Sequence, residues 1–464
     1  MLIRFIVSNF LSFKDETEFN MLTGNYQRHP HHVYHLEHDV NVLKAAAIYG
    51  ANGAGKSNLI KAIAFLKDLV TNKEKNVLSS LHKFKLEPEY ALKPTRFEIE
   101  FETNGKTFSY GIECHQDRIA EEWLVQVGFD KSPDITIFER KTDENHKHSL
   151  QLADKYLQTE KERYFREFFE EQILKADILF VNTEQGEPFE ELSILVKLIT
   201  NIDIIRADET IALSWFGLIA SENQRNRIIQ VFKTFDIGIN DFIIESNDFT
   251  EISNEHKESI KKAFDGMATL DHLPFKQMPN ISSNGTINRN FEIKRTFENI
   301  EWNNGNLILK KLYSIHRNIN KEDIKFDIED ESDGSIRLLE LLHLMEFALP
   351  LPNTILFIDE IDRSVHPSLL KTLLKKIMER TDSQGQLIFT THEANLLDLD
   401  IFRQDEIWFA EKNNEGASTF YSLSDFNPRA DLDIRKGYLN GRFGAIPFLA
   451  NLENLNLNTA DVQN

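Results

Sequence analysis

Short runs of β-branched and aromatic residues dominate the first third of the chain. Three such runs lie between residues 96 and 127, and their composition predicts strands. Asn104-Gly105 separates the first two runs and is typical of a two-residue hairpin turn. Residues 56–70 follow another period, with apolar side chains recurring every three or four positions, which predicts a helix. Residues 1–148 are therefore expected to form mostly β structure.

Helical spacing replaces the strand pattern in the middle of the chain. No segment keeps a heptad repeat for long, so short packed helices are favoured over an extended coiled coil. A stretch rich in Pro, Asn, Ser and Gly at 274–285 is typical of a linker. These patterns predict a mostly helical insertion at residues 149–280. The expected helices cover 156–174, 190–200, 210–235 and 255–267, and residues 178–181 are expected to form a short strand.

An alternation of strands and helices returns after the insertion. Residues 354–360 and 386–392 are apolar runs of strand length, and residues 367–380 between them have helical spacing. Strands that alternate with helices are typical of a parallel sheet. The predicted fold class is therefore α/β. The chain is expected to have three parts, at residues 1–148, 149–280 and 281–464.

Composition and charge narrow the functional classes. The net charge of −21 disfavours broad electrostatic binding to nucleic acid, although it does not exclude a local basic groove. An acidic chain is also suited to bind a basic protein partner. No apolar run approaches the roughly 18 residues that a membrane helix needs. The start of the chain lacks the pattern of a signal peptide. The one cysteine, Cys114, is expected to be a buried, inert thiol. These features predict a cytoplasmic protein that does not enter the membrane.

A glycine-rich loop follows the short apolar run at residues 45–49. Its sequence matches G-x-x-x-x-G-K-S, and a predicted helix follows at once, which is the context that this motif requires. Backbone N–H groups and the helix N-terminus would bind phosphates, Lys56 would reach the β- and γ-phosphates, and Ser57 would ligate Mg²⁺. ATP and Mg²⁺ are therefore the expected cofactors. The expected nucleotide-binding residues are Gly50, Asn52, Gly53, Ala54, Gly55, Lys56, Ser57 and Asn58.

Two carboxylates and a histidine follow the apolar runs of the C-terminal part. Asp359 would hold a Mg²⁺-bound water, and Glu360 could polarise the attacking water as a general base. Ligands bind at the carboxyl ends of parallel strands, so His392 should lie beside Glu360 if the two strands are neighbours. There it could contact the γ-phosphate. A histidine that only caps the following helix is the alternative.

A Ser-x-Gly turn, Ser332-Asp333-Gly334, precedes a predicted helix at residues 340–349. Alone, such a turn is an ordinary helix N-cap or a weak anion site. Its position one helix before the carboxylate strand is similar to that of the signature sequence of the ABC/SMC/RecF group of ATPases, although Asp333 replaces the first glycine of the usual L-S-G-G.

This group resemblance implies an ABC-type ATPase head, with a phosphate-loop sheet, a β lobe and an inserted helical subdomain. It also implies a head-to-tail homodimer sandwich. Ser332 and Gly334 of one subunit would close on the γ-phosphate held by Lys56 of the other, and Asp362 would belong to the Asp-containing loop of the group. The group's lobe-linking glutamine is assigned to no residue, and Gln185 is one candidate.

Four motifs give a finer resemblance. Residues 9–13, 50–59, 331–339 and 438–447 are similar to those of AAA-type ATPases found in prokaryotic anti-phage abortive-infection operons, such as the AriA-type ATPases of PARIS systems and the RloA-like proteins. The resemblance implies an oligomeric, ATP-bound scaffold that senses a phage-encoded trigger protein. Such a scaffold would hold, and then release, a toxic Toprim-type nuclease encoded next to it.

Other functions stay open at this point. A RecF-like or SMC-like ATPase acting on DNA is the main alternative, and the ATPase half of a transporter is disfavoured by the long insertion. The tail residues Arg435, Lys436, Arg442 and Phe443 would pack either on the ATPase core or on a neighbouring subunit. A polar loop is favoured over a zinc site for the histidines before the phosphate loop, because no cysteine is near and the spacing is irregular. These are His29, His31, His32, His35 and His38.

Overall fold

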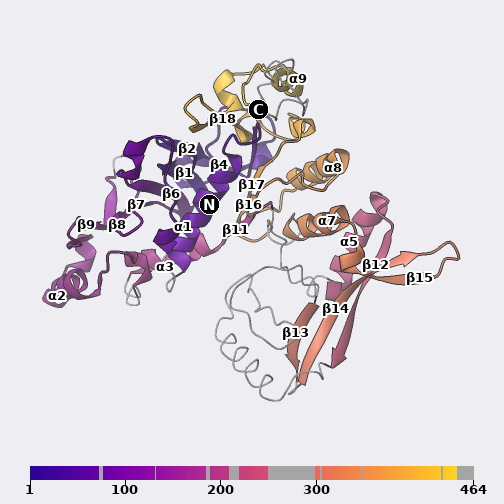
Figure 1. Cartoon of the computed structure of the whole chain (residues 1–464), viewed down its shortest axis with the longest axis horizontal. Coiled ribbons are helices and arrows are strands. Elements are labelled where there is room, and N and C mark those ends of the chain that lie inside the picture. Colours follow the sequence, from indigo (N-terminus) through magenta and orange to yellow (C-terminus); the bar gives the residue numbers. More distant parts are fainter. Residues whose placement is uncertain are drawn as a thin grey trace, which may run out of the picture. The chain divides into compact units, whose positions relative to one another are not determined.

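Figure 1 shows the computed structural model of the chain, which divides into two compact units. The first unit contains Met1–Ile199 and Ile388–Asn464, and the second contains Thr200–Leu387. The residues that the structure describes are 1–72, 77–130, 132–183, 189–207, 219–248, 298–303, 306–345, 349–429 and 432–446.

An antiparallel seven-stranded sheet forms much of the first unit. The predicted hairpin is confirmed, because Asn104 and Gly105 connect two paired strands with φ angles of 53° and 75°, as a type I′ turn requires. The boundary predicted after residue 148 falls inside the last strand, so the β lobe extends past it. In sheet order, the strands are β10 (His148–Leu152), β9 (Ile135–Thr142), β8 (Ile119–Gln126), β7 (Lys106–Cys114), β6 (Thr95–Thr103), β1 (Leu2–Ser8) and β2 (Thr17–Asn20).

The helix α1 (Lys56–Thr71) packs against this sheet through aromatic side chains. The ring of Phe65 on α1 lies 5.4 Å from that of Phe97 on β6, measured between centroids, and Phe10 contacts both. The predicted apolar face of the helix is its buried face, as expected for an amphipathic helix on a core. Cys114, at the end of β7, is buried as predicted, and burial raises the pKa of its thiol to about 12.

A second group of strands in the first unit carries the phosphate loop. The strand β5 (Ala45–Gly50) pairs in parallel with β18 (Ile407–Lys412), and its other neighbour is β17 (Gln386–Thr390). β18 pairs antiparallel with β19 (Ser418–Ser422). All residues of β5 are buried, as expected of a parallel strand covered on both faces.

The C-terminal tail packs on the core of its own unit. The rings of Tyr438, on α9 (Ile434–Leu439), and of Phe443 stack on Phe409 of β18 at centroid distances of 5.6 and 5.8 Å. Phe443 is buried. Of the four tail residues, Phe443 therefore packs on the ATPase core, whereas Arg435, Lys436 and Arg442 are exposed and their alternative stays open.

The described part of the second unit contains a pair of parallel strands, three helices and a small antiparallel sheet. β11 (Ile202–Ile205) pairs in parallel with β16 (Ile355–Ile358). The helices that flank β16 in sequence are α7 (Asp333–His343) and α8 (Pro367–Met378). The small sheet has the order β12 (Ile239–Asp248), β14 (Asn306–Arg317) and β13 (Glu298–Asn303), and β15 (Asp323–Asp327) also pairs with β14.

The predicted helical insertion is only partly helical where the structure describes it. α3 (Glu190–Thr200) has the predicted bounds, α2 (Glu160–Phe168) is shorter than predicted and is followed by a π turn, and α5 (Glu222–Thr234) occupies the end of its predicted range. The predicted insertion also contains the strands β11 and β12, which the prediction of a mostly helical segment did not include. The helix predicted at 255–267, the linker at 274–285 and Gln185 lie outside the described residues. Among the described helices, none is long and apolar enough to cross a bilayer.

The prediction of a strand at residues 178–181 is wrong, because a buried carboxylate accepts hydrogen bonds from two backbone N–H groups of this segment. The N–H groups of Phe180 and Val181 donate to the carboxylate of Glu122 at 2.6 and 3.3 Å, and the segment forms a 3₁₀ turn (Phe180–Asn182). N–H groups satisfied by a side chain cannot also join a strand ladder.

Arg140 completes this buried cluster. Its guanidinium lies 3.7 Å from the Glu122 carboxylate and donates to the carbonyls of Lys175 and Ile178. Tyr110 also donates to Glu122, at 3.0 Å. Both charged side chains are 0% exposed. The pair therefore ties the irregular segment at residues 175–181 to the strands β8 and β9.

Replacing Arg140 by Met should destabilise the protein by about 3–5 kcal/mol, because the variant leaves the Glu122 charge buried without its partner. Urea unfolding followed by intrinsic fluorescence measures the loss. The matched control is Lys141→Met on the same strand, whose ammonium is half-exposed and pairs with surface carboxylates. It should change stability by less than about 1 kcal/mol. Equal stability of the two variants would contradict this account of the pair.

Candidate nucleotide-binding site

The phosphate loop joins β5 to α1, and its glycines meet three different constraints. A Cβ atom on Gly50 would lie 2.4 Å from the Ala410 carbonyl oxygen of β18, so β5 and β18 approach too closely there for a side chain. Gly53 has a φ of 78° and an exposed position with nothing within 4 Å of an added Cβ. Gly55, the N-cap of α1, has a φ of 107°. These left-handed conformations favour glycine and leave an open turn at Gly53.

Lys56 points back into this loop. Its side chain is 4% exposed, and its ammonium donates to the carbonyls of Gly50 and Ala51 at 2.8 and 3.1 Å. The same ammonium lies 3.4 Å from Nδ1 of His392, which is exposed and follows the end of β17 by two residues. The structure therefore brings together a lysine and a histidine that are 336 residues apart in sequence.

The alternative role for His392 as a helix cap is wrong. The next helical turn is the 3₁₀ segment Ala394–Leu396, and its N-cap is Glu393, whose carboxylate accepts from the N–H of Asn395 at 2.8 Å. The N–H of Glu393 itself donates to the Thr391 hydroxyl at 3.0 Å. His392 is thus placed beside Lys56 by a turn that its neighbours stabilise.

A hydroxyl network that the sequence analysis missed supports the loop. The Ser12 hydroxyl accepts from the Asn58 amide at 2.7 Å and from the Ser418 hydroxyl at 2.8 Å, and the Ser12 carbonyl accepts from the Ser418 N–H at 2.8 Å. A Cβ on Gly55 would lie 2.1 Å from the Ser418 Oγ. Asn58, predicted to bind nucleotide, therefore uses its amide to hold the loop. Ser12 lies in the sequence motif at residues 9–13, which could have indicated its role, whereas no sequence motif pointed to Ser418.

The same N-terminal motif is anchored by Asn9. Its amide nitrogen donates to the carbonyls of Tyr90, Lys93 and Pro94 at 2.8, 3.0 and 3.2 Å, and its amide oxygen accepts from the N–H of Phe84 at 3.1 Å. Asn9 is buried and has a φ of 51°. The motif thus has a structural role, because it positions Ser12 under the phosphate loop.

The two predicted carboxylates lie in the second unit, at the end of β16. The N–H of Asp359 donates to the Ile205 carbonyl at 2.8 Å, and this side chain is 6% exposed. Glu360 is half-buried and has a φ of 48°, which ends the strand in a left-handed turn. Such a conformation is strained for a residue other than glycine and is common at functional sites.

The Ser-x-Gly turn lies next to the segment that follows these carboxylates. Ser332 is the N-cap of α7, and its hydroxyl accepts from the N–H of Ser335 at 3.1 Å. The helix therefore begins at Asp333, earlier than the predicted residue 340. A Cβ on Gly334 would lie 2.7 Å from the Ser364 carbonyl oxygen, so a glycine is needed for this close approach. The half-buried Asp362 lies two residues before Ser364.

The helix α7 itself carries buried polar side chains. Arg337 and Glu340 form a buried ion pair with a distance of 3.2 Å between nitrogen and oxygen. Burial lowers the pKa of His343 to about 4, so this imidazole is neutral at pH 7. The Ser-x-Gly turn thus starts a helix that is firmly packed in the second unit.

The predicted site residues therefore form two groups. Lys56, the loop glycines and His392 belong to the first unit, whereas Asp359, Glu360, Asp362, Ser332 and Gly334 belong to the second. The expectation that His392 lies beside Glu360 stays a prediction, as do the roles of Ser57 and Asp359 as Mg²⁺ ligands. Asn52 is exposed in the phosphate loop, and Ala54 is buried.

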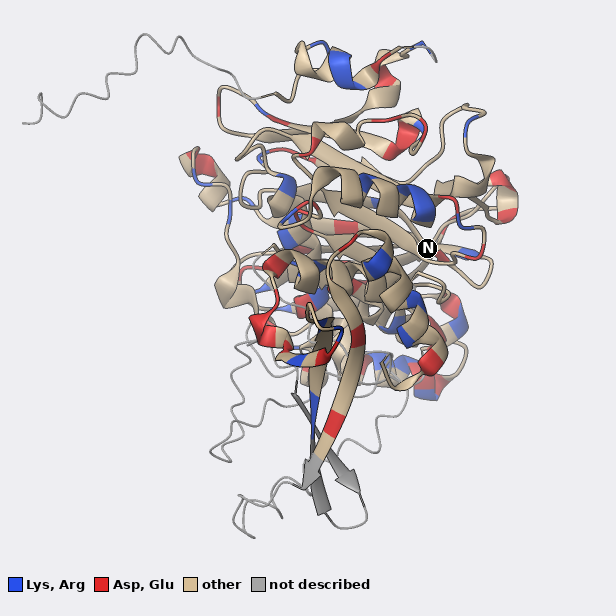
Figure 2. Ribbon diagram, turned by 90° about the vertical axis from the view of Figure 1, so that its right-hand side faces the viewer, with Lys and Arg blue, Asp and Glu red and all other residues tan. Residues whose placement is uncertain are grey.

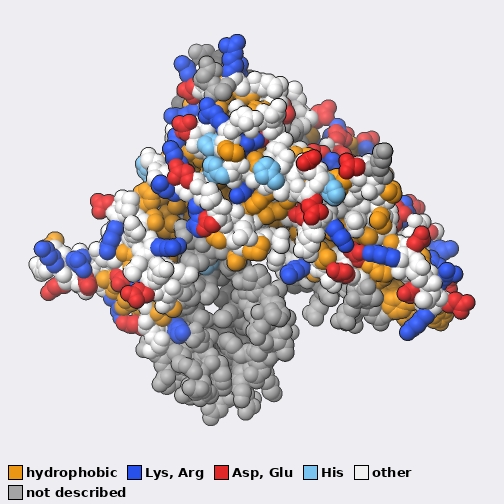
Figure 3. All heavy atoms as spheres, turned by 180° about the vertical axis from the view of Figure 1, so that it is seen from behind, with side chains coloured by type: hydrophobic (Ala, Val, Ile, Leu, Met, Phe, Trp, Pro, Cys, Tyr) orange, Lys and Arg blue, Asp and Glu red, His pale blue; other side chains and the backbone are white. Residues whose placement is uncertain are grey.

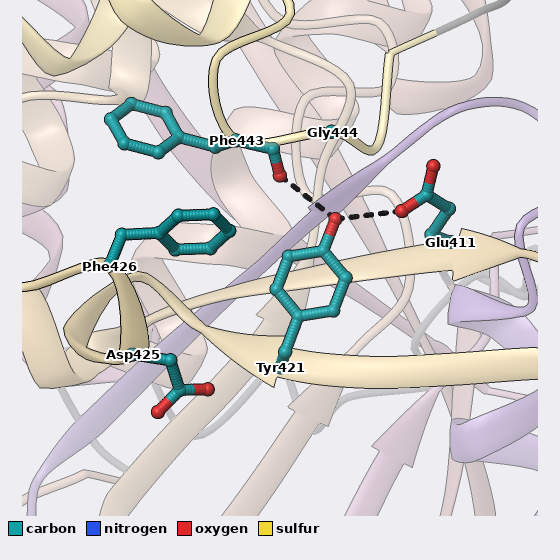
Figure 4. Close-up of a pocket in the computed structure, with 6 residues that line it drawn as sticks. All are labelled: Glu411, Tyr421, Asp425, Phe426, Phe443 and Gly444. Atoms are coloured by element: carbon teal, nitrogen blue, oxygen red, sulfur yellow. Dashed lines mark hydrogen bonds between the residues drawn. The ribbon is translucent and has the colours of Figure 1, made fainter.

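A separate cavity lies between the tail and the end of β18 (Figure 4). Its volume is about 390 Å³. The Tyr421 hydroxyl donates to the Phe443 carbonyl at 2.8 Å and to the Glu411 carboxylate at 3.0 Å. Aromatic rings with carboxylates are suited to a cationic group. None of the predicted site residues is among the residues that line it, which are Glu411, Tyr421, Asp425, Phe426, Phe443 and Gly444.

These observations define an α/β protein with a phosphate loop between a parallel strand and a helix. Comparison with protein families gives a more specific assignment. Residues 45–398 match the family model described as "AAA domain, putative AbiEii toxin, Type IV TA system", and the chain belongs to this family of AAA ATPases. The match begins at β5 and ends after His392.

Solved structures with similarity to this chain include three heads of SMC proteins. One is the SMC head bound to the C-winged helix domain of ScpA, with 12% identity and a TM-score of 0.38. The alignment covers 92% of this chain and 99% of that chain. The second is the SMC head domain from Thermotoga maritima, with 12% identity and a TM-score of 0.33. The alignment covers 91% of this chain and 98% of that chain. The third, from Pyrococcus furiosus, carries an extended coiled coil and is bound to the C-terminal domain of ScpA.

For this third structure, the identity is 13%, the coverage is 95% of this chain and 98% of that chain, and the TM-score is 0.37. Similarity at this level carries no argument about function. No curated protein sequence matches the chain.

Proposed function

We propose that this chain is a Mg²⁺-dependent ATPase whose complete active site forms between two copies, and that its ATP-bound state holds a toxic effector in anti-phage defence. The observation that carries the catalytic part is the position of Lys56, whose buried ammonium lies on the loop carbonyls and 3.4 Å from His392. A buried ammonium at the N-terminus of a helix is suited to bind a phosphate chain.

The chain's own residues divide the chemistry among them. The loop around Gly53 has open space for a phosphate, and its N–H groups and Lys56 would bind the β- and γ-phosphates. Ser57 and Asp359 would hold Mg²⁺, whose charge stabilises the transferred phosphoryl group. Glu360 would accept a proton from the attacking water, and His392 would contact the γ-phosphate. The strained turn at Glu360 supports a functional role for this residue.

A second copy would complete the site. The turn at Ser332 and Gly334 begins a helix of 11 residues, and the N-terminus of such a helix favours an anion. Gly334 lies against the segment that contains Asp362, close to Glu360 in sequence. In the proposed homodimer, this turn closes on the triphosphate bound by Lys56 of the other copy. Higher homo-oligomers would be built from such pairs.

The effector part of the proposal rests on the family and on charge. The family description names a toxin and a toxin–antitoxin system. The net charge of −21 favours a basic protein partner. We take the effector to be a Toprim-type nuclease encoded by a neighbouring gene, released when a phage-encoded trigger binds, as in the AriA-type ATPases.

A RecF/SMC-like ATPase acting on DNA is the second candidate. Along the described ribbon in Figure 2, segments coloured for Lys and Arg are interspersed with segments coloured for Asp and Glu. Nucleic-acid binding generally relies on clustered positive charge, so the effector-holding scaffold is favoured.

Glu360→Gln should bind ATP as the parent does and hydrolyse it at least about 100-fold more slowly, because the variant keeps the shape of the site and loses the base. Isothermal titration measures binding, and phosphate release measures turnover. Lys56→Ala is the control and should bind no ATP. Parent-like turnover by Glu360→Gln would assign the base to another group.

Sharing of the site between copies is tested by mixing two inactive variants. Ser332→Arg blocks the signature turn, and Lys56→Ala blocks the phosphate loop. In an equal mixture, half of the pairs contain both variants and each has one intact site, so about a quarter of the parent rate should return. Either variant alone should stay inactive. A mixture without recovery, or one that regains the full rate, would contradict a site shared across the pair.

The effector is tested by co-expressing the chain with the product of the adjacent gene. The two proteins should co-elute in the presence of ATP. The Lys56→Ala variant should not associate with the effector, and cells that express both should therefore suffer the toxicity of the free effector. A DNA-binding titration on the same preparation separates the candidates. ATP-dependent DNA affinity that falls steeply with salt, without co-elution of the neighbouring product, would favour the RecF/SMC-like function.

A further inference from the structure

Three of the five histidines that precede β5 gather in space. His29 lies just before the 3₁₀ turn Pro30–His32, which contains His31 and His32. Each of the three rings offers one nitrogen, and these nitrogens all lie within 4.8 Å of one another. His32 is buried, whereas His29 and His31 are half-buried. Figure 3 shows several histidine side chains, in pale blue, on one face of the molecule.

Each of two rings, those of His29 and His32, is held by a contact at one of its nitrogens. Nδ1 of His32 lies 3.0 Å from both carboxylate oxygens of Glu406, and Nε2 of His29 lies 2.9 Å from the Leu399 carbonyl oxygen. Metal-ligating histidines almost always bind a carboxylate or a backbone carbonyl through the ring nitrogen that does not bind the metal. This arrangement is an observation independent of the proximity of the three rings.

The loop that carries the rings is held firmly. Arg403 donates to the carbonyls of Tyr26 and Arg28 at 3.2 and 2.8 Å, and its own N–H donates to Glu406 at 2.8 Å. Asp405 accepts from the N–H of Gly24 at 2.7 Å. The same short segment, residues 403–406, therefore anchors both the loop and the ring of His32, and such support favours a defined ligand geometry.

We propose that His29, His31 and His32 bind a divalent transition-metal ion of the zinc class, with water completing the coordination. Zinc–nitrogen bonds of about 2.0–2.1 Å place tetrahedral ligand atoms about 3.3 Å apart. The nitrogens would have to approach one another by at most about 1.5 Å to bind one ion. Imidazole ligands select zinc, copper, nickel or cobalt over Mg²⁺. The site is therefore chemically distinct from the proposed ATP site.

The metal would have a structural role beside the phosphate loop. Glu406 directly precedes β18, which pairs with β5, the strand that leads into the loop. A metal bound by the three histidines would fix their rings, and the contacts of His29 with Leu399 and of His32 with Glu406 would pass this constraint to the segment before β18. This role does not depend on the proposed ATPase function.

The test uses the full chain without a histidine tag. It is incubated with zinc chloride in excess Mg²⁺ and dialysed, and bound zinc is measured by plasma mass spectrometry. The expected result is about one zinc ion per chain, with an affinity at least about 100-fold lower in His29→Ala and His31→Ala. Cobalt in place of zinc should give visible absorption bands of a four- or five-coordinate nitrogen site.

Two control variants separate the site from other histidines and from the nucleotide. His35→Ala removes a nearby imidazole that bonds Asn41 instead, and Lys56→Ala disables the phosphate loop. Both should keep the full zinc content. Circular dichroism checks that every variant folds. Zinc absent from the parent chain, or lost equally in His35→Ala, would overturn the proposal.

Discussion

The phosphate loop holds a backbone conformation that few residues other than glycine adopt easily, and the rest of the candidate site depends on keeping it. The loop is supported from below by hydroxyl groups: Ser12 accepts from Asn58 and Ser418, and Ser418 fills the space that a side chain at Gly55 would need. With the loop fixed, Lys56 can direct its ammonium to the loop carbonyls and to His392. A lysine on a mobile loop would lose this preorganisation.

Buried polar side chains fix irregular backbone at several places in the first unit. Asn9 binds three carbonyls and one N–H of residues 84–94. Glu122 and Arg140 bind the backbone of residues 175–181, and Arg403 binds the loop at residues 24–28. Because buried backbone groups must be paired, each of these side chains replaces a strand neighbour that the loop lacks. The proposed metal site uses the same principle, with a buried carboxylate orienting a histidine.

The second unit has a comparable organisation around a close backbone approach. Gly334 permits contact between the start of α7 and the turn after Glu360, and Asp359 is held by β11 through its N–H group. The Ser-x-Gly turn and the pair of carboxylates thus lie in one packed unit. Further along the same helix, burial lowers the pKa of His343 to about 4, so its imidazole is neutral at pH 7.

The sequence alone determined the elements whose signals are local. The phosphate loop, the helix after it, the Asn104-Gly105 hairpin and the bounds of α3 all follow from neighbouring residues, because turn chemistry and helical periodicity act over a few positions. Only the tertiary structure decided the role of Asn58, the 3₁₀ turn where a strand was predicted, the strands in the predicted helical insertion, the packing of the tail and the gathering of three histidines. In each case the deciding partner is distant in sequence, as Ser418 is from Ser12 by 406 residues, and no local pattern records such a contact.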